Sequence, residues 1–503
     1  MTVKKIIINK NSWQTRIAIT SNDVLQNVYF SDHATTSLER SFFKGKITKL
    51  LPGIQTAFVD IGQEKSGFLH ISEVDRELAI ERISKTTQLD DEPRKKPRVR
   101  VAPDISKIFK EGENVLVQVN KEPIYEKGAK LTTCFTLPGR FIVLMPNIPR
   151  IGISKKIEDR DERTRLRDLV KAALPEGMGA IIRTTSDGAD AQQITKDIKY
   201  LLNTWDTIQS RYEKASTAEL LHEDLELSLQ IVRDHLDDDV EAIITDDKDN
   251  QNKIYKFIKT TAPEYANKVV IYDGVPGIFE HFRVEKQIED ALHKRVELKS
   301  GGSLIIETTE AMTVIDVNTG KFIGKANMEE TIFKNNHEAA EEVVRQLRLR
   351  NIGGLIVIDF VDMTSSVNKQ KLFKFFEKTL REQDKFQSVV LKISEFGIVQ
   401  MTRKRSGKTL VQQLTETCCA CKGYGFIKSL QIESYEMLRQ IKKDLKANAK
   451  IKMLTLHVNP KVFEYITSSE YNAILDLEKT HNAKITIFSQ DSYATTQYKI
   501  EKK

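Results

Sequence analysis

The chain has 503 residues, of which 40% are hydrophobic and 30% charged, a balance that excludes a wholly disordered protein. Lysine and arginine total 78 against 71 aspartate and glutamate, and the formal charge of +7 permits a polyanionic partner without requiring one. Because the first ten residues lack a signal-peptide core and no 18-residue apolar stretch occurs, we expect a cytoplasmic protein of three or more globular units without a membrane partner.

The N-terminal third is predicted to be rich in β-structure. Residues 1–39 alternate polar and apolar side chains, which indicates short strands. From residue 40 to 122, β segments joined by glycine turns predict a small barrel. A polar, proline-bearing stretch at about 77–107 interrupts it, and Arg94–Arg100 has five basic residues in seven. We expect a flexible basic insertion there.

The rest of the chain mixes helices and strands. Residues 123–221 predict charged helices near 157–173 and 189–215, and residues 222–286 predict acidic helices with a strand at 268–272. Strong β runs alternate with long helices from 287 to 413, as in α/β proteins. A cysteine–glycine knuckle follows, and the tail, 428–503, is predicted to run helix, strand, helix, strand.

Two apolar strands end in acidic residues. Residues 312–318 place Asp316 and Asn318 on one face of a strand, and residues 355–359 end in Asp359. Near-continuous apolar runs predict strands covered on both faces, where an ionised aspartate is costly unless it is paired or bound to a cation. Two such ends side by side would suit Mg²⁺. The alternative is that each aspartate caps a following turn, which applies at least equally to Asp362.

A helix between these strands is predicted over about 328–350, with an apolar stripe at helical spacing. Its C-terminal end carries Arg345, Arg348 and Arg350. These arginines either complement the helix dipole or contact phosphate.

The cysteines are concentrated in one knuckle. Cys418, Cys419 and Cys421 lie within four residues, and Cys418 with Cys421 forms the Cys-x-x-Cys spacing that binds one edge of a tetrahedral Zn²⁺. Because a closed site needs four ligands, a site shared across a symmetric dimer explains the pair better than an isolated histidine does. Free thiols in a turn are the alternative, and a redox motif lacks a thioredoxin-like context.

Taken together, these stretches resemble the ribonuclease E/G family over nearly the whole chain. In chain order the matching stretches are Phe58-Val59-Asp60, Gly67-Phe68-Leu69, Leu144-Met145-Pro146-Asn147, Leu174–Gly179, Arg183-Thr184, Gly301-Gly302-Ser303, Ile315-Asp316-Val317-Asn318, Arg345–Met363 and the knuckle. The lack of a long disordered tail favours the shorter of the family's two proteins.

The resemblance implies a multidomain α/β fold with an inserted all-β S1 (OB-type) barrel. Its implied domains are a ribonuclease-H-like domain in two parts (1–39 and 222–286), the S1 barrel (40–122), a 5′-end sensor region (123–221), a DNase-I-like catalytic domain (287–413), a zinc link (414–427) and a small α/β dimerisation domain (428–503).

The resemblance also assigns roles to particular residues. Asp316 and Asp359 match magnesium ligands, which Asn318 helps to position. The expected RNA-binding residues are Phe58 and Phe68, which would stack bases, Lys44, and the 5′-monophosphate pocket of Gly128, Arg183 and Thr184. Cys418 and Cys421 match zinc ligands shared by two subunits of a homodimer or higher homo-oligomer.

The implied activity is magnesium-dependent hydrolysis of single-stranded RNA, stimulated by a 5′-monophosphate, in ribosomal RNA maturation and messenger RNA turnover. A non-catalytic S1-type RNA-binding protein and a magnesium phosphatase are the alternatives; the first leaves the acidic strand ends unexplained and the second the barrel. Two departures from the family pattern stand out. Cys419 would allow the knuckle to shift to Cys419 and Cys421, and Glu395 replaces a basic residue in an RNA-contacting stretch.

Overall fold

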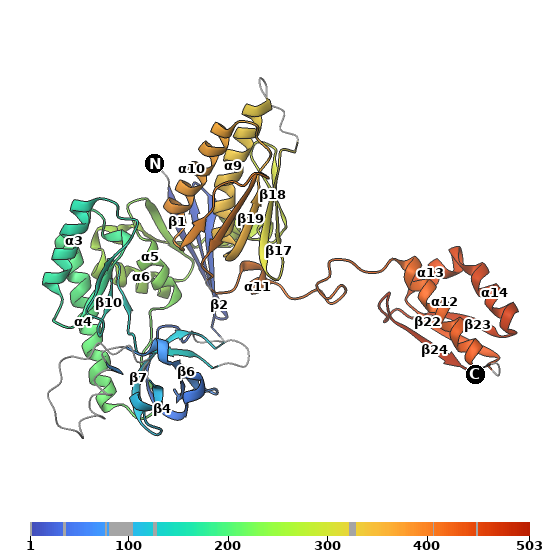
Figure 1. Ribbon diagram of the computed structural model, residues 1–503, viewed down its shortest axis with the longest axis horizontal. Helices are drawn as coiled ribbons and strands as arrows, with labels where there is room; N and C mark the ends of the chain where they lie inside the picture. Colours follow the sequence, from blue (N-terminus) through green and yellow to red (C-terminus); the bar gives the residue numbers. More distant parts are fainter. Residues whose placement is uncertain are drawn as a thin grey trace. The chain divides into compact units, whose positions relative to one another are not determined.

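The computed structural model describes residues 3–33, 37–75, 78–79, 104–123, 128–320, 328–405, 407–448 and 451–503. The chain divides into two compact units, Met1–Gln413 and Leu414–Lys503 (Figure 1). The basic run Arg94–Arg100 and most of the predicted insertion lie outside the described residues. No helix in the described ranges is long and apolar enough to cross a membrane.

The first sheet joins two segments that are distant in the sequence. It has the order β15-β14-β1-β2-β3, and β1 pairs in parallel with β14 and antiparallel with β2. Its strands are β1 (Lys4–Lys10), β2 (Gln14–Ser21), β3 (Val24–Asp32), β14 (Val240–Thr245) and β15 (Val269–Ile271). Helices α5 (Leu227–His235) and α6 (Lys248–Thr261) share a core with one face, and α7 (Ile278–His281) and α8 (Val284–Asp290) with the other. Covering on both faces explains why consecutive isoleucines, Ile6–Ile8, are all buried.

The predicted small barrel is confirmed. Its strands are β4 (Phe42–Leu51), β5 (Thr56–Asp60), β6 (Gly67–His70), β7 (Asn114–Lys121) and β8 (Lys130–Thr132). The order β4-β5-β6-β8-β7 closes because β7 pairs back onto β4. Alternate residues such as Ile47, Val59 and Leu69 fill the interior, with the short helix α2 (Ile105–Ile108) beside them. Strand β13 (Glu219–His222) extends the sheet at β4.

A four-stranded sheet with two helices follows the barrel. Its order is β11-β12-β10-β9, from β9 (Leu137–Pro138), β10 (Ile142–Met145), β11 (Ile151–Ile153) and β12 (Gly179–Ile182). Helices α3 (Arg160–Ala173) and α4 (Ala191–Lys214) confirm the two predicted charged helices, and Asp159 and Asp190 cap their N-termini.

A six-stranded sheet carries the acidic strand ends. Its order is β16-β17-β18-β19-β21-β20, from β16 (Arg295–Glu297), β17 (Ser303–Thr308), β18 (Met312–Asn318), β19 (Gly354–Asp359), β20 (Ser388–Val390) and β21 (Ile398–Arg403). Helices α9 (Met328–Leu349) and α10 (Ser366–Gln383) lie side by side against it (Figure 1).

The expectation that both faces of these strands are covered was wrong. The core shared with α9 and α10 contains Ile315 and Ile358, which belong to one face of the sheet, whereas Leu355 on the opposite face is 40% exposed. The strands therefore alternate like those of a sheet with one covered face. As a consequence, the aspartates do not need a cation merely to offset deep burial.

The second unit begins with the cysteine knuckle, next to the end of α11 (Leu410–Leu414). It contains α12 (Leu430–Ala447), β22 (Met453–Val458), α13 (Pro460–Ser469), α14 (Tyr471–His481), β23 (Lys484–Ser489) and β24 (Tyr498–Lys502), with the sheet order β23-β22-β24. The predicted order omitted α14 and β24, because β24 is short and charged and α14 follows α13 almost without a break.

Candidate functional site

The two acidic strand ends are neighbours in the sheet. Strands β18 and β19 are parallel, and their register sets Asp316 directly beside Asp359. Asn318 lies two residues beyond Asp316 on the same face, and its Nδ2 donates a 2.7 Å hydrogen bond to Asp316 Oδ2. The pairing that the sequence predicted is confirmed, and the amide fixes the orientation of one of the two carboxylates.

Like charge gathers at this edge. Burial raises the pKa of Asp359, and the neighbouring carboxylates of Asp316 and Asp362 raise it further; within the described part of the chain no cation offsets them. No three His, Cys, Asp or Glu side chains of the described residues are grouped as a metal site. Two adjacent carboxylates still suit Mg²⁺, which binds one or two of them and completes its shell with water and phosphate oxygens.

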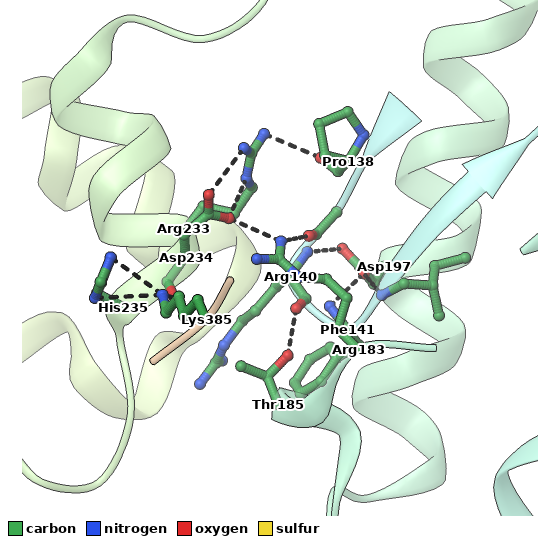
Figure 2. Close-up of polar contacts among 12 residues, drawn as sticks. Pro138, Arg140, Phe141, Arg183, Thr185, Asp197, Arg233, Asp234, His235 and Lys385 are labelled. Carbon is green, nitrogen blue, oxygen red and sulfur yellow. Dashed lines mark hydrogen bonds and ion pairs between the residues drawn. The ribbon is translucent and has the colours of Figure 1, made fainter. Parts of the chain in front are cut away.

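A second polar site lies in a cleft of about 1890 Å³, lined by residues of the first sheet, β12 and the segment after α10. Arg183, at the end of β12, donates through Nη1 to Asp234 Oδ1 at 2.7 Å and to the Gly139 carbonyl at 2.6 Å. Arg233 also binds Asp234, so two guanidinium groups converge on one carboxylate (Figure 2). Although burial opposes ionisation, the two arginines hold the pKa of Asp234 well below its usual range.

Lysine 385 brings another cation to the same cleft. Lys385 Nζ donates to the Asp234 carbonyl at 3.0 Å and lies 3.1 Å from His235 Nε2 (Figure 2). Desolvation by the surrounding protein, together with the charges of Arg183 and Arg348, lowers the pKa of Lys385 to about 8 despite the nearby Asp234. Thr184 also lines the cleft, and its hydroxyl lies 3.0 Å from that of Ser154. Cations and hydroxyls together suit an anionic ligand.

Gly128 does not belong to this cleft, which corrects the predicted pocket. It packs on the barrel, where a Cβ would lie 1.9 Å from the Ser66 carbonyl oxygen. The glycine that contacts Arg183 is Gly139, where a Cβ would lie 2.4 Å from Asp197 Oδ2. Asp197 in turn accepts hydrogen bonds from the backbone N–H groups of residues 140–142. Both glycines permit a close approach, but only Gly139 does so beside Arg183.

The barrel aromatics lie on its outer surface. Phe58 and Phe68 are directly paired on β5 and β6, and both are only half-buried, whereas their neighbours Val59 and Leu69 fill the core. The open choice between barrel core and outer face is thereby decided for the outer face. Two adjacent rings on a barrel face can stack unpaired bases.

Lys44 has a structural role in this conformation. Its Nζ donates to the carbonyl oxygens of Tyr212, at 2.9 Å, and Ala215, at 2.8 Å, at the C-terminal end of α4. It also lies 5.1 Å from the centre of the Tyr212 ring. A cation that satisfies the last carbonyls of a helix stabilises that end, so Lys44 would have to leave α4 to bind RNA.

The arginines at the end of α9 likewise bind protein. Arg345 donates to the Leu25 carbonyl at 2.8 Å and Arg348 to Asn27 Oδ1 at 2.7 Å, so both connect α9 to β3. Burial lowers the pKa of Arg350, which directly follows α9, to about 10, and Arg350 donates to Gln346 of that helix. Of the two interpretations left open by the sequence, these contacts favour the structural one.

The cysteine knuckle adopts a tight turn. Lys422 N donates to the Cys418 carbonyl at 2.7 Å, and Gly423 and Gly425 take positive φ angles of 90° and 80°. Hydrogen bonds from the backbone N–H groups of Cys421 and Ala420 lower the pKa of the Cys418 thiol. The thiolate is the form of cysteine that binds metal.

Comparisons with known proteins place the chain in a family. Residues 136–406 match the model of the "Ribonuclease E/G family", and residues 417–503 match "RNase E/G, Thioredoxin-like domain". Ribonuclease G of Haemophilus influenzae is 35% identical and that of Escherichia coli strain K12 is 34% identical, each over 99% of both chains. The chain belongs to the ribonuclease E/G family. Ribonuclease E of H. influenzae is 34% identical over 99% of this chain, which covers 52% of that longer protein.

Three residues around Arg183 in this ribonuclease E/G chain were missed from the sequence: Asp234 and Lys385, which line the same cleft (the arginine cleft), and Gly139, whose carbonyl accepts a hydrogen bond from Arg183. Asp234 and Lys385 lie in charged helical segments, where a solvated surface is the usual interpretation, and Gly139 follows a proline in an apparent turn. Only the tertiary fold brings them to Arg183. Glu395, the departure noted above, is exposed in the turn that precedes β21.

Proposed function

We propose that the chain is a magnesium-dependent endoribonuclease that cuts single-stranded RNA and leaves a 5′-phosphate and a 3′-hydroxyl. The observation that carries the proposal is the in-register pair of Asp316 and Asp359, which no cation of the described residues neutralises. Membership of the ribonuclease E/G family supports RNA as the substrate. Roles in ribosomal RNA maturation and messenger RNA turnover belong to the same proposal.

The residues of the acidic edge would act as follows. Asp316 and Asp359 would hold the metal through hard oxygen ligands. Asn318 fixes Asp316 Oδ2 and so leaves Oδ1 as the oxygen that faces a ligand. When bound, a magnesium ion supplies charge stabilisation for the phosphate and lowers the pKa of a water molecule. The mutual repulsion of the carboxylates favours cation binding, because the cation relieves it.

The first prediction concerns this pair. Asp316→Asn or Asp359→Asn should lower turnover by at least about 100-fold, because each replaces a charged ligand by a neutral group of the same shape. RNA affinity, measured by fluorescence anisotropy, should change little. Glu310→Gln, at an exposed turn of the β17–β18 hairpin, is the matched control and should cleave normally.

Two outcomes would reject this assignment. Cleavage at the wild-type rate by either aspartate variant at limiting Mg²⁺ would remove the carboxylates from the mechanism. Tight RNA binding without cleavage by the wild-type protein would instead support the alternative of a non-catalytic RNA-binding protein.

The arginine cleft is proposed as the sensor of a 5′-monophosphate. Arg183 and Thr184, which line the cleft, would bind the phosphate. In this structure Arg183 donates a hydrogen bond to the carboxylate of Asp234. Phosphate binding would thus compete with an internal carboxylate for the half-buried guanidinium of Arg183. Lys385 adds a positive charge on the opposite side of Asp234.

This competition gives the second prediction. Arg183→Ala should erase the preference for 5′-monophosphate over 5′-hydroxyl RNA, a loss of roughly 10- to 150-fold from about 1.5–3 kcal/mol for a charged contact. Asp234→Asn should raise the preference, because it removes the internal competitor. Initial rates on paired substrates measure both ratios. Equal preference in all three proteins would exclude the sensor.

We further propose that Cys418 and Cys421 hold zinc jointly with the same pair of a second chain. The stabilised thiolate of Cys418 supports metal binding, and two ligands per chain require a partner for a four-ligand site. We also propose the domains expected from the family, with the ranges given above. The sheet of β1–β3, β14 and β15 would be the core of the ribonuclease-H-like domain. The sheet of β16–β21 would be the core of the DNase-I-like domain.

A further inference from the structure

The loop that follows β19 is held by helix α9. The N–H of Val361 donates to Asn336 Oδ1 at 3.0 Å, and Asn336 Nδ2 donates back to the Val361 carbonyl at 2.7 Å. Val361 lies between Asp359 and Asp362, so one side chain fixes the peptide that sets the spacing of the two carboxylates. Asn336 is fully buried. An amide carries its donor and its acceptor on two separate atoms, so it can bind the N–H and the carbonyl of one residue at the same time.

The far end of the same loop has its own anchor on α9. Glu329 accepts hydrogen bonds from the backbone N–H groups of Thr364, at 3.2 Å, and Ser365, at 3.0 Å. A hydrogen bond from the Thr364 hydroxyl, together with these two backbone contacts, lowers the pKa of Glu329 to about 2. Gly397, which directly precedes β21, also packs against the loop, since a Cβ there would lie 3.0 Å from Asp362 Oδ1. The loop is therefore fixed at its middle and at its end.

The neighbouring Asn335 lies against the other acidic strand. Gly302 is packed so closely that a Cβ would lie 2.2 Å from Asn335 Oδ1 and 2.7 Å from the Asn318 carbonyl oxygen. Asn335 Nδ2 is buried, and no hydrogen-bond partner for it is found among the described residues. Two adjacent, fully buried asparagines thus face the two ends that carry the candidate ligands, one at each strand.

We propose that Asn336 is a positioning residue that holds the loop after Asp359 in the conformation needed for metal binding. The inference rests on the proposed magnesium function and deepens it. Asparagine is a poor residue for a helix interior, and burying its amide is costly unless both of its groups are used. Here both are used on one peptide of the acidic loop. An apolar side chain would serve α9 better if packing alone were required.

The test compares metal affinity with folding. Asn336→Asp keeps the shape but loses the donor, and Asn336→Leu loses both hydrogen bonds. Mn²⁺, a paramagnetic substitute for Mg²⁺, is titrated into the whole protein without RNA and followed by electron paramagnetic resonance. Both variants should bind Mn²⁺ roughly 10-fold more weakly or worse, as expected for the loss of a buried hydrogen-bonded clamp.

Kinetics separate positioning from general damage. In the variants kcat should fall while KM for RNA stays near the wild-type value, and excess Mn²⁺ should restore much of the loss. Gln346→Leu is the matched control, because Gln346 is also buried on α9 and bonds to Glu342 and Arg350, not to the loop that carries Asp362. It should lower thermal stability without changing Mn²⁺ affinity. Glu329→Gln, at the loop end, should weaken Mn²⁺ binding by a smaller factor.

The outcomes distinguish the inference from its basis. If the wild-type protein binds no Mn²⁺, the proposed magnesium function fails and the inference fails with it. If the wild-type protein binds Mn²⁺ and a folded Asn336→Asp binds it equally well, only the positioning role is overturned. Where Asn336→Leu does not fold, Asn336→Asp and Glu329→Gln carry the test. A Gln346→Leu protein that also loses Mn²⁺ would show that any damage to α9 has this effect.

Discussion

Three carboxylates at the end of one strand pair differ in their surroundings. Asp316 is oriented by the amide of Asn318, Asp359 faces Asp316 across the register, and Asp362 lies three residues further on, beside Gly397. Each therefore contributes differently to a cation site. Asp316 has a fixed direction, Asp359 has a raised pKa, and Asp362 adds negative charge from outside the strand.

This arrangement predicts the pH dependence of metal binding. A proton and a metal ion compete for the carboxylate of Asp359, whose pKa is raised. On acidification, Mn²⁺ binding should therefore be lost at a higher pH than it would be if Asp359 had the pKa of a free aspartate, about 3.9. Asp362→Asn removes one repelling charge and lowers the pKa of Asp359. The acidic midpoint of Mn²⁺ binding should then move to lower pH.

Titrating Mn²⁺ at a series of pH values measures that midpoint. Asp362→Asn should keep most of the affinity at neutral pH if Asp362 acts through charge alone. A weaker plateau with an unmoved midpoint would show that Asp362 is itself a ligand and that its repulsion of Asp359 is unimportant.

At the scale of elements, the barrel presents the paired aromatic rings of Phe58 and Phe68 on its outer surface. Phe58→Ala and Phe68→Ala should each weaken binding of single-stranded RNA by about 5- to 150-fold, from roughly 1–3 kcal/mol of stacking per base. Tyrosine at either position should restore binding, because it keeps the ring. Ile54→Ala is the control, since Ile54 is 60% exposed on the β4–β5 loop but has no ring. Equal affinity of all variants would place RNA on another surface.

The sheets show which features a sequence can reveal. The alternation of side chains predicted that Asp316 and Asn318 share a face, and the parallel α/β pattern predicted that Asp359 lies beside them, because both properties follow from local periodicity. The number of covered faces could not be deduced, since apolar residues such as Leu355 also occur on exposed faces.

The arginine cleft shows what local pattern misses. Arg183 was identified from a motif, but Asp234 comes from α5, about 50 residues further along the chain, and Lys385 from the segment after α10, about 200 residues further. No periodicity encodes such contacts. Gly128 was predicted to be a neighbour of Arg183, whereas Gly139 was not considered, and its contact with Arg183 depends on tertiary packing.

At the scale of the whole molecule, the first unit is tied together by one short segment. Asp384 forms a fully buried ion pair with Arg403 of β21, at 2.6 Å, and its carbonyl accepts a 2.6 Å hydrogen bond from Lys156. The next residue, Lys385, reaches Asp234. The end of α10 thus connects the sheet of β16–β21, the segment before α3 and the end of α5 within the unit Met1–Gln413.

The second unit carries the last prediction, that zinc binding and dimer formation are one linked equilibrium. Each chain offers Cys418 and Cys421, two thiolates where a closed site takes four. The stoichiometry should be about half a zinc per chain. Cys418→Ser with Cys421→Ser should lose zinc and shift the protein towards monomer, whereas Cys419→Ser should do neither, because backbone N–H groups stabilise the thiolate of Cys418.

Metal analysis combined with light scattering on these variants measures both quantities at once. Chelation should dissociate the wild-type protein to the same extent as the double substitution does. Added zinc should restore the dimer of the chelated wild-type protein but not that of the double variant. Short RNA should still be cut by the monomer, since Asp316 and Asp359 belong to one chain and one sheet. One zinc per chain, or a metal-free dimer of normal stability, would contradict the shared site. Loss of zinc from Cys419→Ser in place of Cys418→Ser would instead assign the metal to the shifted pair.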